Sequence, residues 1–214
     1  MKEQKDRARQ SWKGTGDQED QKKWFQITES LSSTEFLGYE QTESESEIIS
    51  IIKKDLETEN LSQQEEGIII LNQTPFYGES GGQIGDSGKI KFENNVFEVS
   101  QTTKLFGSFF LHHGKVTRGI FAKGDKVSAK IDETKRELIK CNHSSTHLLH
   151  SSLRIILGNH VSQKGSLVNN EKLRFDFSHN EPISSENIYK IENYVKKEIK
   201  SNSKINTKII CLVQ

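Results

Sequence analysis

The stretch DKVSAKIDETKRELIKCNHSSTHLLH, residues 125–150, changes its periodicity at Asp132. The apolar residues before that point alternate with polar ones, at Val127, Ala129 and Ile131. Such alternation is typical of a half-buried β-strand. After Asp132 the sequence contains no glycine or proline until Gly158, which stands where a helix C-terminus is expected. The stretch therefore predicts a strand that leads directly into a long helix.

Upstream of this junction, the sequence is rich in glycine and in short apolar runs. These runs are GIIIL at 67–71, KIKFENNVFEVS at 89–100 and SFFLHHGKV at 108–116. Asn94 and Asn95 fit a tight hairpin turn within the second run. Several short strands at close spacing predict a small antiparallel β-barrel over residues 33–133. An acid-rich segment over residues 29–66 is interpreted as a solvated surface.

Downstream of the junction, helical and strand patterns alternate. Leu138, Leu149, Leu153 and Ile156 form an apolar stripe at helical spacing. Asn169 and Asn170 mark a turn, after which LRFDF alternates as a strand, and a second helix is expected after Pro182. The final segment KINTKIICLV is predicted to be a strand. We expect residues 134–214 to be an α+β unit, residues 1–32 to be a helical lead-in and linker, and the fold class to be α+β.

The composition excludes several classes of protein. No apolar run approaches the length of a membrane-spanning helix, and the charged N-terminus lacks the apolar stretch of a secretory signal. Two cysteines form no disulfide framework, which favours a cytoplasmic protein. The 30 basic and 30 acidic residues cancel, so net charge gives no general argument for binding nucleic acid.

His143 and His147 are four residues apart, so they share one face of the predicted helix, which His150 and Arg154 extend. Two imidazoles at this spacing can bind one Zn²⁺, or they can be ordinary surface histidines. Ser144 and Ser145 stand where a zinc protease would carry its catalytic Glu, which argues against proteolysis.

The second candidate cluster is TPFYGESGGQIGDSG at residues 74–88. Its glycines allow a ligand to approach the backbone closely, although an array of β-turns explains them as well. It lacks the Gly-Lys-Ser/Thr ending of a phosphate-binding loop. Polar groups at its rim include Thr74, Glu79 and Gln83.

Together these stretches resemble alanyl-tRNA synthetases, which are class II aminoacyl-tRNA synthetases. The resemblance rests on five segments in the family's order: QKDRARQSWKG at 4–14, TEFLGYE at 34–40, QTPFYGESGGQIGDSG at 73–88, NHSSTHLLHSSLRIILGNHVSQKGSLV at 142–168 and LRFDFSH at 173–179. The family places a β-barrel before an editing core, so the resemblance assigns residues 33–133 to the barrel and 134–214 to the first part of that core.

The resemblance implies an editing function. A pocket built for alanine cannot strongly reject serine or glycine, so a second site is expected to hydrolyse mischarged Ser-tRNA(Ala) or Gly-tRNA(Ala). The implied site residues are Thr74 for sensing the serine hydroxyl, Gln83 and Gln163 for orienting the ester or water, Gly81, Gly82 and Arg154 for binding substrate, and His143 and His147 for zinc.

Zinc would either activate a bound water or orient the substrate, and the sequence leaves both roles open. The family completes its zinc site with a downstream Cys-x-x-x-His element, so two further ligands are expected beyond Gln214, and ATP is expected to bind only in the family's synthetase part. Two alternatives remain: a free-standing editing enzyme that acts in trans, and a tRNA-binding fragment without catalysis.

Overall fold

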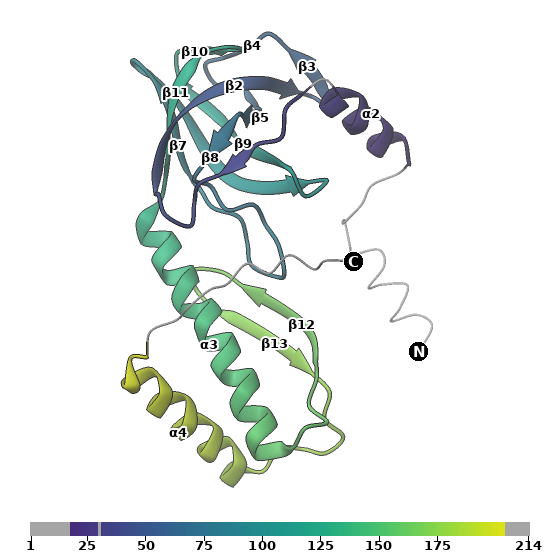
Figure 1. Cartoon of the computed structure of the whole chain (residues 1–214), viewed down its shortest axis with the longest axis vertical. Coiled ribbons are helices and arrows are strands. Elements are labelled where there is room, and N and C mark those ends of the chain that lie inside the picture. The colour runs from purple at the N-terminus through teal and green to yellow at the C-terminus, as the bar shows by residue number, and fades with distance from the viewer. Residues whose placement is uncertain (1–17, 30, 204–214) are drawn as a thin grey trace.

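The fold is described by a computed structural model, which covers residues 18–29 and 31–203. In Figure 1 the upper half is a barrel of strands, and the lower half, called the helical half below, contains two helices and a hairpin of two strands. Residues 1–17 of the predicted lead-in and linker, and the predicted final strand, lie outside these residues, whereas residues 18–29 of the lead-in form a helix. The elements in chain order are α2 (Gln18–Glu29), β1 (Glu35–Phe36), β2 (Glu43–Lys53), β3 (Leu56–Thr58), β4 (Asn60–Ser62), β5 (Glu66–Leu71), β6 (Gln73–Thr74), β7 (Gly88–Phe92), β8 (Asn95–Leu105), β9 (Phe109–Arg118), β10 (Ile120–Ala122), β11 (Lys126–Ile131), α3 (Glu133–Leu157), β12 (Gln163–Val168), β13 (Leu173–Phe177) and α4 (Ser185–Ser201).

The barrel is a closed antiparallel sheet, and the predicted α+β class is confirmed. Its strand order is β11-β7-β8-β9-β5-β2, and β11 pairs back with β2 to close it. Closure leaves the main ladder without an exposed edge. Its interior is filled by aliphatic and aromatic side chains, including Ile51, Ile69, Phe76, Phe97 and Phe121.

The acid-rich segment forms the strand β2, which sequence analysis missed. Along β2 the glutamates at 43, 45 and 47 are exposed, whereas Ser44 and Ser46 are buried. The two serine hydroxyls lie 2.9 Å apart and hydrogen-bond to one another, so their inward position leaves these polar groups partnered. In residues 43–47 the alternation was present in the sequence, but small polar residues occupy the inward positions, and the buried isoleucines Ile48, Ile51 and Ile52 follow only in the second half of the strand.

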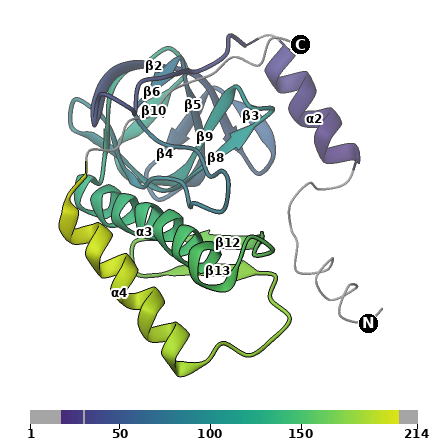
Figure 2. The same ribbon diagram turned by 60° about the horizontal axis from the view of Figure 1, so that its bottom comes forward.

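Helix α3 begins immediately after β11, as the periodicity predicted. Asp132 caps it by accepting a hydrogen bond from Lys135 N, and Gly158 ends it with its N–H on Arg154 O. The β12–β13 hairpin and α4 both pack against α3 (Figure 2). Their shared core contains Leu153, Val161 and Ile191, with Leu149 and Ile156 packed against it. Leu138, which the predicted stripe included, is exposed; it lies near the barrel end of α3, outside this core.

Arg136, in the first turns of α3, joins the helix to two loops of the barrel. Its Nε donates to both carboxylate oxygens of Asp86 at 2.9 Å, and Nη2 also contacts this carboxylate. Its remaining donors reach Gly38 O at 2.9 Å and Pro75 O at 2.8 Å. The Asp86 side chain is 3% exposed and that of Arg136 is 12% exposed, so water screens this pair poorly.

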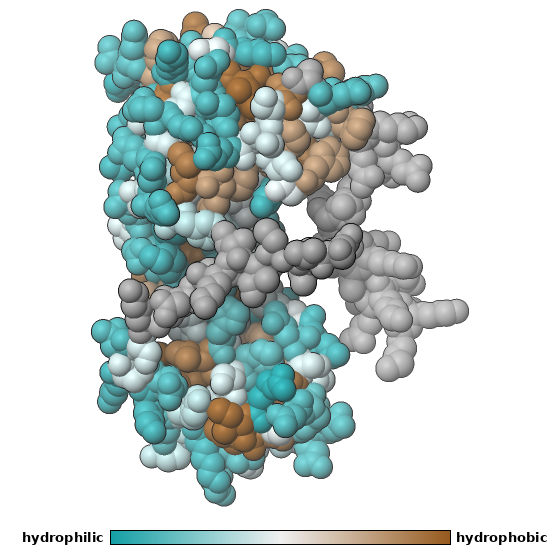
Figure 3. Space-filling view, viewed as in Figure 1, coloured by the Kyte–Doolittle hydropathy of each residue, from teal (hydrophilic) through white to brown (hydrophobic). Residues whose placement is uncertain are grey.

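The surface in Figure 3 is mostly hydrophilic, with separate hydrophobic patches over the barrel and over the helical half. Within residues 18–29 and 31–203, no helix is both long and apolar enough to cross a membrane.

Replacing Arg136 by Met should lower the free energy of unfolding by about 3–5 kcal/mol, because it leaves the buried Asp86 carboxylate without its cation. Urea unfolding measures the loss. Lys140→Met is the matched control, since the Lys140–Glu137 pair on the same helix is exposed and contributes at most about 1 kcal/mol. Equal losses in the two variants would contradict the anchoring role of Arg136.

Candidate functional site

The two predicted histidines meet on the surface of α3. His143 Nε2 and His147 Nε2 lie 3.0 Å apart, and their ring centroids are 5.0 Å apart. The helix provides this arrangement because residues four apart stand one above the other on the same face. Nitrogen atoms at this separation can share a proton or can bind a common cation.

Gln83 determines which nitrogen of His143 carries a proton. Its amide oxygen, Oε1, lies 2.5 Å from His143 Nδ1, and an amide oxygen can only accept a hydrogen bond. His143 therefore carries its proton on Nδ1, and its Nε2 presents a lone pair toward His147. Burial lowers the pKa of His143, and the neighbouring His147 lowers it further, so the neutral ring is favoured. Hydrogen bonding of this kind orients metal-binding histidines in many proteins.

Gln83 is held in place by a short contact between the glycine-rich loop and β12. Val168 N donates to Gly82 O at 2.8 Å, and Ile84 N donates to Val168 O at 3.1 Å. Gly82 has a φ of +86°, and an added Cβ would lie 2.5 Å from Ser166 O. Only glycine fits this approach, which lets the backbones of the loop and the hairpin hydrogen-bond directly.

Three further predicted residues are exposed. Gln163 lies on β12, Gly81 on the glycine-rich loop and Arg154 on α3. Gln163 Nε2 donates to Ser166 Oγ at 3.2 Å, and Ser166 Oγ donates to Gly81 O at 3.3 Å. Gln163 is thereby linked to the glycine-rich loop that carries Gln83. Arg154 is exposed two helical turns beyond His147.

Thr74 is placed apart from the histidine pair. It is fully buried, its hydroxyl lies 2.8 Å from His112 Nε2, and Phe76 N donates to the same oxygen at 3.1 Å. His112 Nδ1 lies 2.9 Å from Ile69 O, a carbonyl that can only accept. The structure therefore gives Thr74 a supporting position at the start of the glycine-rich loop and does not bring its hydroxyl to His143.

The structure adds residues that sequence analysis did not select. Arg136 and Asp86 fix the glycine-rich loop, Ser166 links it to Gln163, and Asn142 Nδ2 donates to Asn169 O at 2.8 Å, which ties α3 to the hairpin turn. For Asp86, Asn142 and Ser166 the only available signal was their position inside the recognised segments, and Arg136 lies outside those segments, because each acts through a partner elsewhere in the sequence.

A cation at the histidine pair would need further ligands. Zinc sites in proteins use roughly three or four protein ligands. Among the residues that the structure describes, no three His, Cys, Asp or Glu side chains gather closely enough to hold a metal ion. Cys141 is exposed, and Cys211 lies outside the described part of the chain. The paired imidazoles fit one half of a zinc site.

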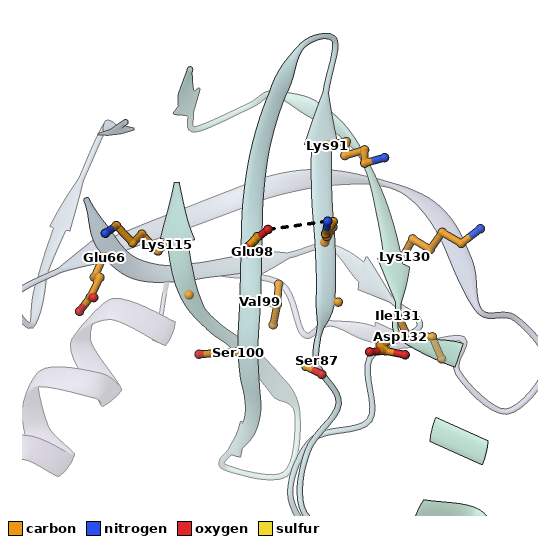
Figure 4. A pocket seen from close by; sticks show the side chains of 13 residues that line it. Glu66, Ser87, Lys91, Glu98, Val99, Ser100, Lys115, Lys130, Ile131 and Asp132 are labelled. Atoms are coloured by element: carbon orange, nitrogen blue, oxygen red, sulfur yellow. Dashed lines mark ion pairs between the residues drawn. The ribbon is translucent and has the colours of Figure 1, made fainter. Parts of the chain in front are cut away.

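A groove on the outer face of the barrel is a separate feature. Its volume is about 680 Å³, and Lys89, Lys91, Lys115 and Lys130 border it. Glutamates offset part of this charge: Lys89 pairs with Glu98 at 3.7 Å (Figure 4), and Lys130 pairs with Glu43 and Glu133. The groove contains none of the predicted site residues.

Comparisons with known proteins identify the family. A sequence profile described as "tRNA synthetases class II (A)" matches residues 1–135. The chain belongs to this family of class II tRNA synthetases. It is also 43% identical over 212 residues to the alanine–tRNA ligase of Nitrobacter winogradskyi, a match that covers 99% of this chain and 24% of the relative. The chain thus spans about a quarter of the length of this relative.

Membership of the class II tRNA synthetase family confirms the resemblance drawn from the sequence segments. The family match ends at residue 135, in the first turn of α3. The histidine pair and Gln163 lie beyond it, in the region covered by the similarity to the alanine–tRNA ligase. The roles of these residues are not described by either comparison.

Gly82→Ala should detach the glycine-rich loop from β12, because the new methyl group meets Ser166 O. Hydrogen exchange at the amides of Ile84 and Val168 should accelerate. Gly81→Ala is the matched control, since Gly81 also has a positive φ of +60° but has open space at its Cβ. It should lose only about 1–2 kcal/mol of stability and keep both amides protected. Equal protection in the two variants would show that the loop docks by other contacts.

The barrel should lose stability as the pH falls from 7 to 5. Burial lowers the pKa of His112 to about 4, against 6.5 for an unperturbed histidine. Between pH 7 and pH 5, His112 becomes protonated in the unfolded chain but stays neutral in the folded protein. The unfolded state is therefore stabilised, and the stability present above pH 6.5 is progressively lost. The expected loss is about 2 kcal/mol.

Urea unfolding at the two pH values measures this loss, and His112→Gln should remove most of it. His113→Gln should keep it, because His113 is less buried than its neighbour. An NMR titration of the wild-type His112 ring gives the midpoint directly, and a midpoint above pH 6 would contradict the argument even if His112→Gln fails to fold.

Proposed function

We propose that this chain is the hydrolytic editing region of an alanine–tRNA ligase. Its substrate is tRNA(Ala) that carries serine or glycine, and the bond it cleaves is the ester at the 3′ end. The observation that carries the proposal is the pair of convergent imidazole nitrogens at His143 and His147, held by Gln83, in a chain with 43% identity to such a ligase.

A separate hydrolytic site is needed because binding alone discriminates poorly between alanine, serine and glycine. A pocket that accepts alanine can distinguish an added hydroxyl by only about 10²-fold, and it cannot exclude the smaller glycine by size. Hydrolysis at a second site multiplies this discrimination. In the complete ligase we expect ATP-dependent attachment of alanine to occur elsewhere, in parts of the protein that the chain does not represent.

His143 and His147 are the residues of this chain that would bind Zn²⁺, through their Nε2 atoms. The fit rests on the tautomer, because the proton on His143 Nδ1 leaves Nε2 free to bind a cation. Zinc, when bound, supplies an electrophile that lowers the pKa of water or polarises a carbonyl oxygen. The remaining ligands would come from residues other than those described.

The other side chains divide into positioning and contact roles. Gln83 is 8% exposed and lies behind His143, so it orients the imidazole and does not face the substrate. Gln163 is exposed and is linked to Gly81 through Ser166, so it is available to orient the ester or the attacking water. The hydroxyl of Thr74 is already bonded to His112, so Thr74 can sense serine only if that contact breaks.

Release of labelled serine from Ser-tRNA(Ala) tests the proposal. In the complete ligase, His147→Ala should reduce the rate by at least about 100-fold, since a reacting group displaced by about 1 Å loses that much. Gln163→Ala should reduce turnover and leave the zinc content unchanged. Lys140→Ala, an exposed change on the same helix, should have no effect, and Ala-tRNA(Ala) should stay intact throughout.

Zinc affinity gives a second readout, by competition with a chromophoric chelator. Gln83→Ala should weaken binding about 10- to 100-fold, as expected when the partner of a metal-bound histidine is lost. Hydrolysis that is insensitive to His147→Ala would show that the pair is structural. Binding of tRNA(Ala) without any hydrolysis would instead support a tRNA-binding role.

A further inference from the structure

Four aromatic rings form a cluster on the barrel loops next to α3. Phe36 stacks on Phe110 with centroids 5.2 Å apart, and it also contacts Tyr39 at 5.0 Å and Tyr77 at 6.2 Å, both edge to face. Phe36 and Phe110 are the inner members. Tyr39 is the outer member, and 71% of its surface is exposed.

The backbone beneath Tyr39 is fixed. Arg136 Nη1 donates to Gly38 O at 2.9 Å, and Glu40 N and Gln41 N both donate to Leu37 O at 3.1 Å. Gly38 lies so close to Pro75 that an added Cβ would be 2.2 Å from the Pro75 oxygen. Tyr39 is therefore an exposed ring on a rigid base, and ordering it in a complex costs little conformational entropy.

The backbone next to Tyr39 is held from the face of α3 that carries the histidine pair. Arg136, which holds Gly38, and His143 are seven residues apart, so they share a helix face and are separated by about 10 Å along the axis. A ligand that extends along this face can contact both places. A flexible chain of a few nucleotides has the required reach.

We propose that Tyr39, with Tyr77 beside it, is a stacking platform for unpaired bases at the 3′ end of an RNA. This inference rests on the proposed function and extends it by assigning a binding surface for the single-stranded end of the substrate. Aromatic rings stack on bases with about 1–3 kcal/mol per base, whatever the base. In duplex RNA the bases are already stacked on one another, so their faces are unavailable.

Electrostatic attraction to phosphates is not the source of the proposed affinity of this surface for RNA. The exposed side chains near Tyr39 include the carboxylates of Glu35 and Glu40. Of the nearby cations, Arg136 is paired with Asp86, and Lys104 Nζ lies 5.1 Å from the Phe110 centroid. Stacking should therefore dominate, and the affinity should depend only weakly on salt concentration.

The test is fluorescence anisotropy of the whole chain with a short, labelled single-stranded RNA that ends in CCA. Tyr39→Ala should weaken binding about 5- to 150-fold, the equivalent of one lost stack. Tyr39→Phe, which keeps the ring, should bind within about twofold of wild type. Tyr189→Ala is the matched control, because Tyr189 on α4 is 66% exposed. The unfolding midpoints of all variants confirm that they are folded.

The proposal is overturned if the wild-type chain does not bind this RNA, or if Tyr39→Ala and Tyr189→Ala bind it equally well. It is also overturned if Tyr39→Phe loses as much affinity as Tyr39→Ala, since the hydroxyl would then carry the contact. A duplex RNA that competes as well as the single strand would contradict stacking. Because no ester is cleaved here, this measurement is separate from the serine-release assay, and failure of the stacking platform is distinguishable from failure of the proposed function.

Discussion

The ion pair between Arg136 and Asp86 is the contact on which the joining of barrel and helix depends. Each nitrogen of the guanidinium group has a partner in the barrel: the Asp86 carboxylate, Gly38 O and Pro75 O. A buried pair of this kind gains little net energy over an apolar replacement, but it tolerates only one geometry. Its value here lies in that geometry, because it fixes two loops and one helix at a single point.

The orientation of the candidate site follows from this point. Asp86 ends the glycine-rich loop, and Tyr77 N donates to its carboxylate at 2.7 Å, so both ends of the loop are held. Between those ends, Gly82 docks on Val168 and leads into Gln83. Gln83 then fixes the proton of His143. Three elements that are far apart in the sequence thus determine the state of one imidazole ring.

In this arrangement, the groups that could act on a ligand are different from the groups that hold them in position. The groups that could act on a ligand, His143, His147 and Gln163, are at the surface of the helical half, and the groups that position them are buried or backbone atoms. The exposed ring of Tyr39 follows the same rule, since Arg136 holds the backbone next to it. Sites built on rigid elements in this way lose less entropy when they bind a ligand.

The sequence by itself determined most of the local structure. Glycine spacing and alternation predicted the barrel, the change of period at Asp132 predicted α3, and the spacing of four predicted that His143 and His147 share a face. These features depend on near neighbours in the chain, and so a pattern of residues is enough to show them. The recognised segments also identified the family, because they contain most of the loop and helix that form the site.

Only the tertiary structure decided which side chains meet. Nothing local joins Gln83 to His143, Thr74 to His112 or Arg136 to Asp86, which are separated by 60, 38 and 50 residues. The first half of β2 gave no apolar signal because its inward residues are serines that bond to each other, whereas the isoleucines of its second half did give one. Thr74, which was predicted to sense the serine hydroxyl, is buried, and its hydroxyl is hydrogen-bonded to the buried His112. Pairings of polar groups across long separations depend on how the closed sheet and the helix pack, and a linear pattern does not contain that packing.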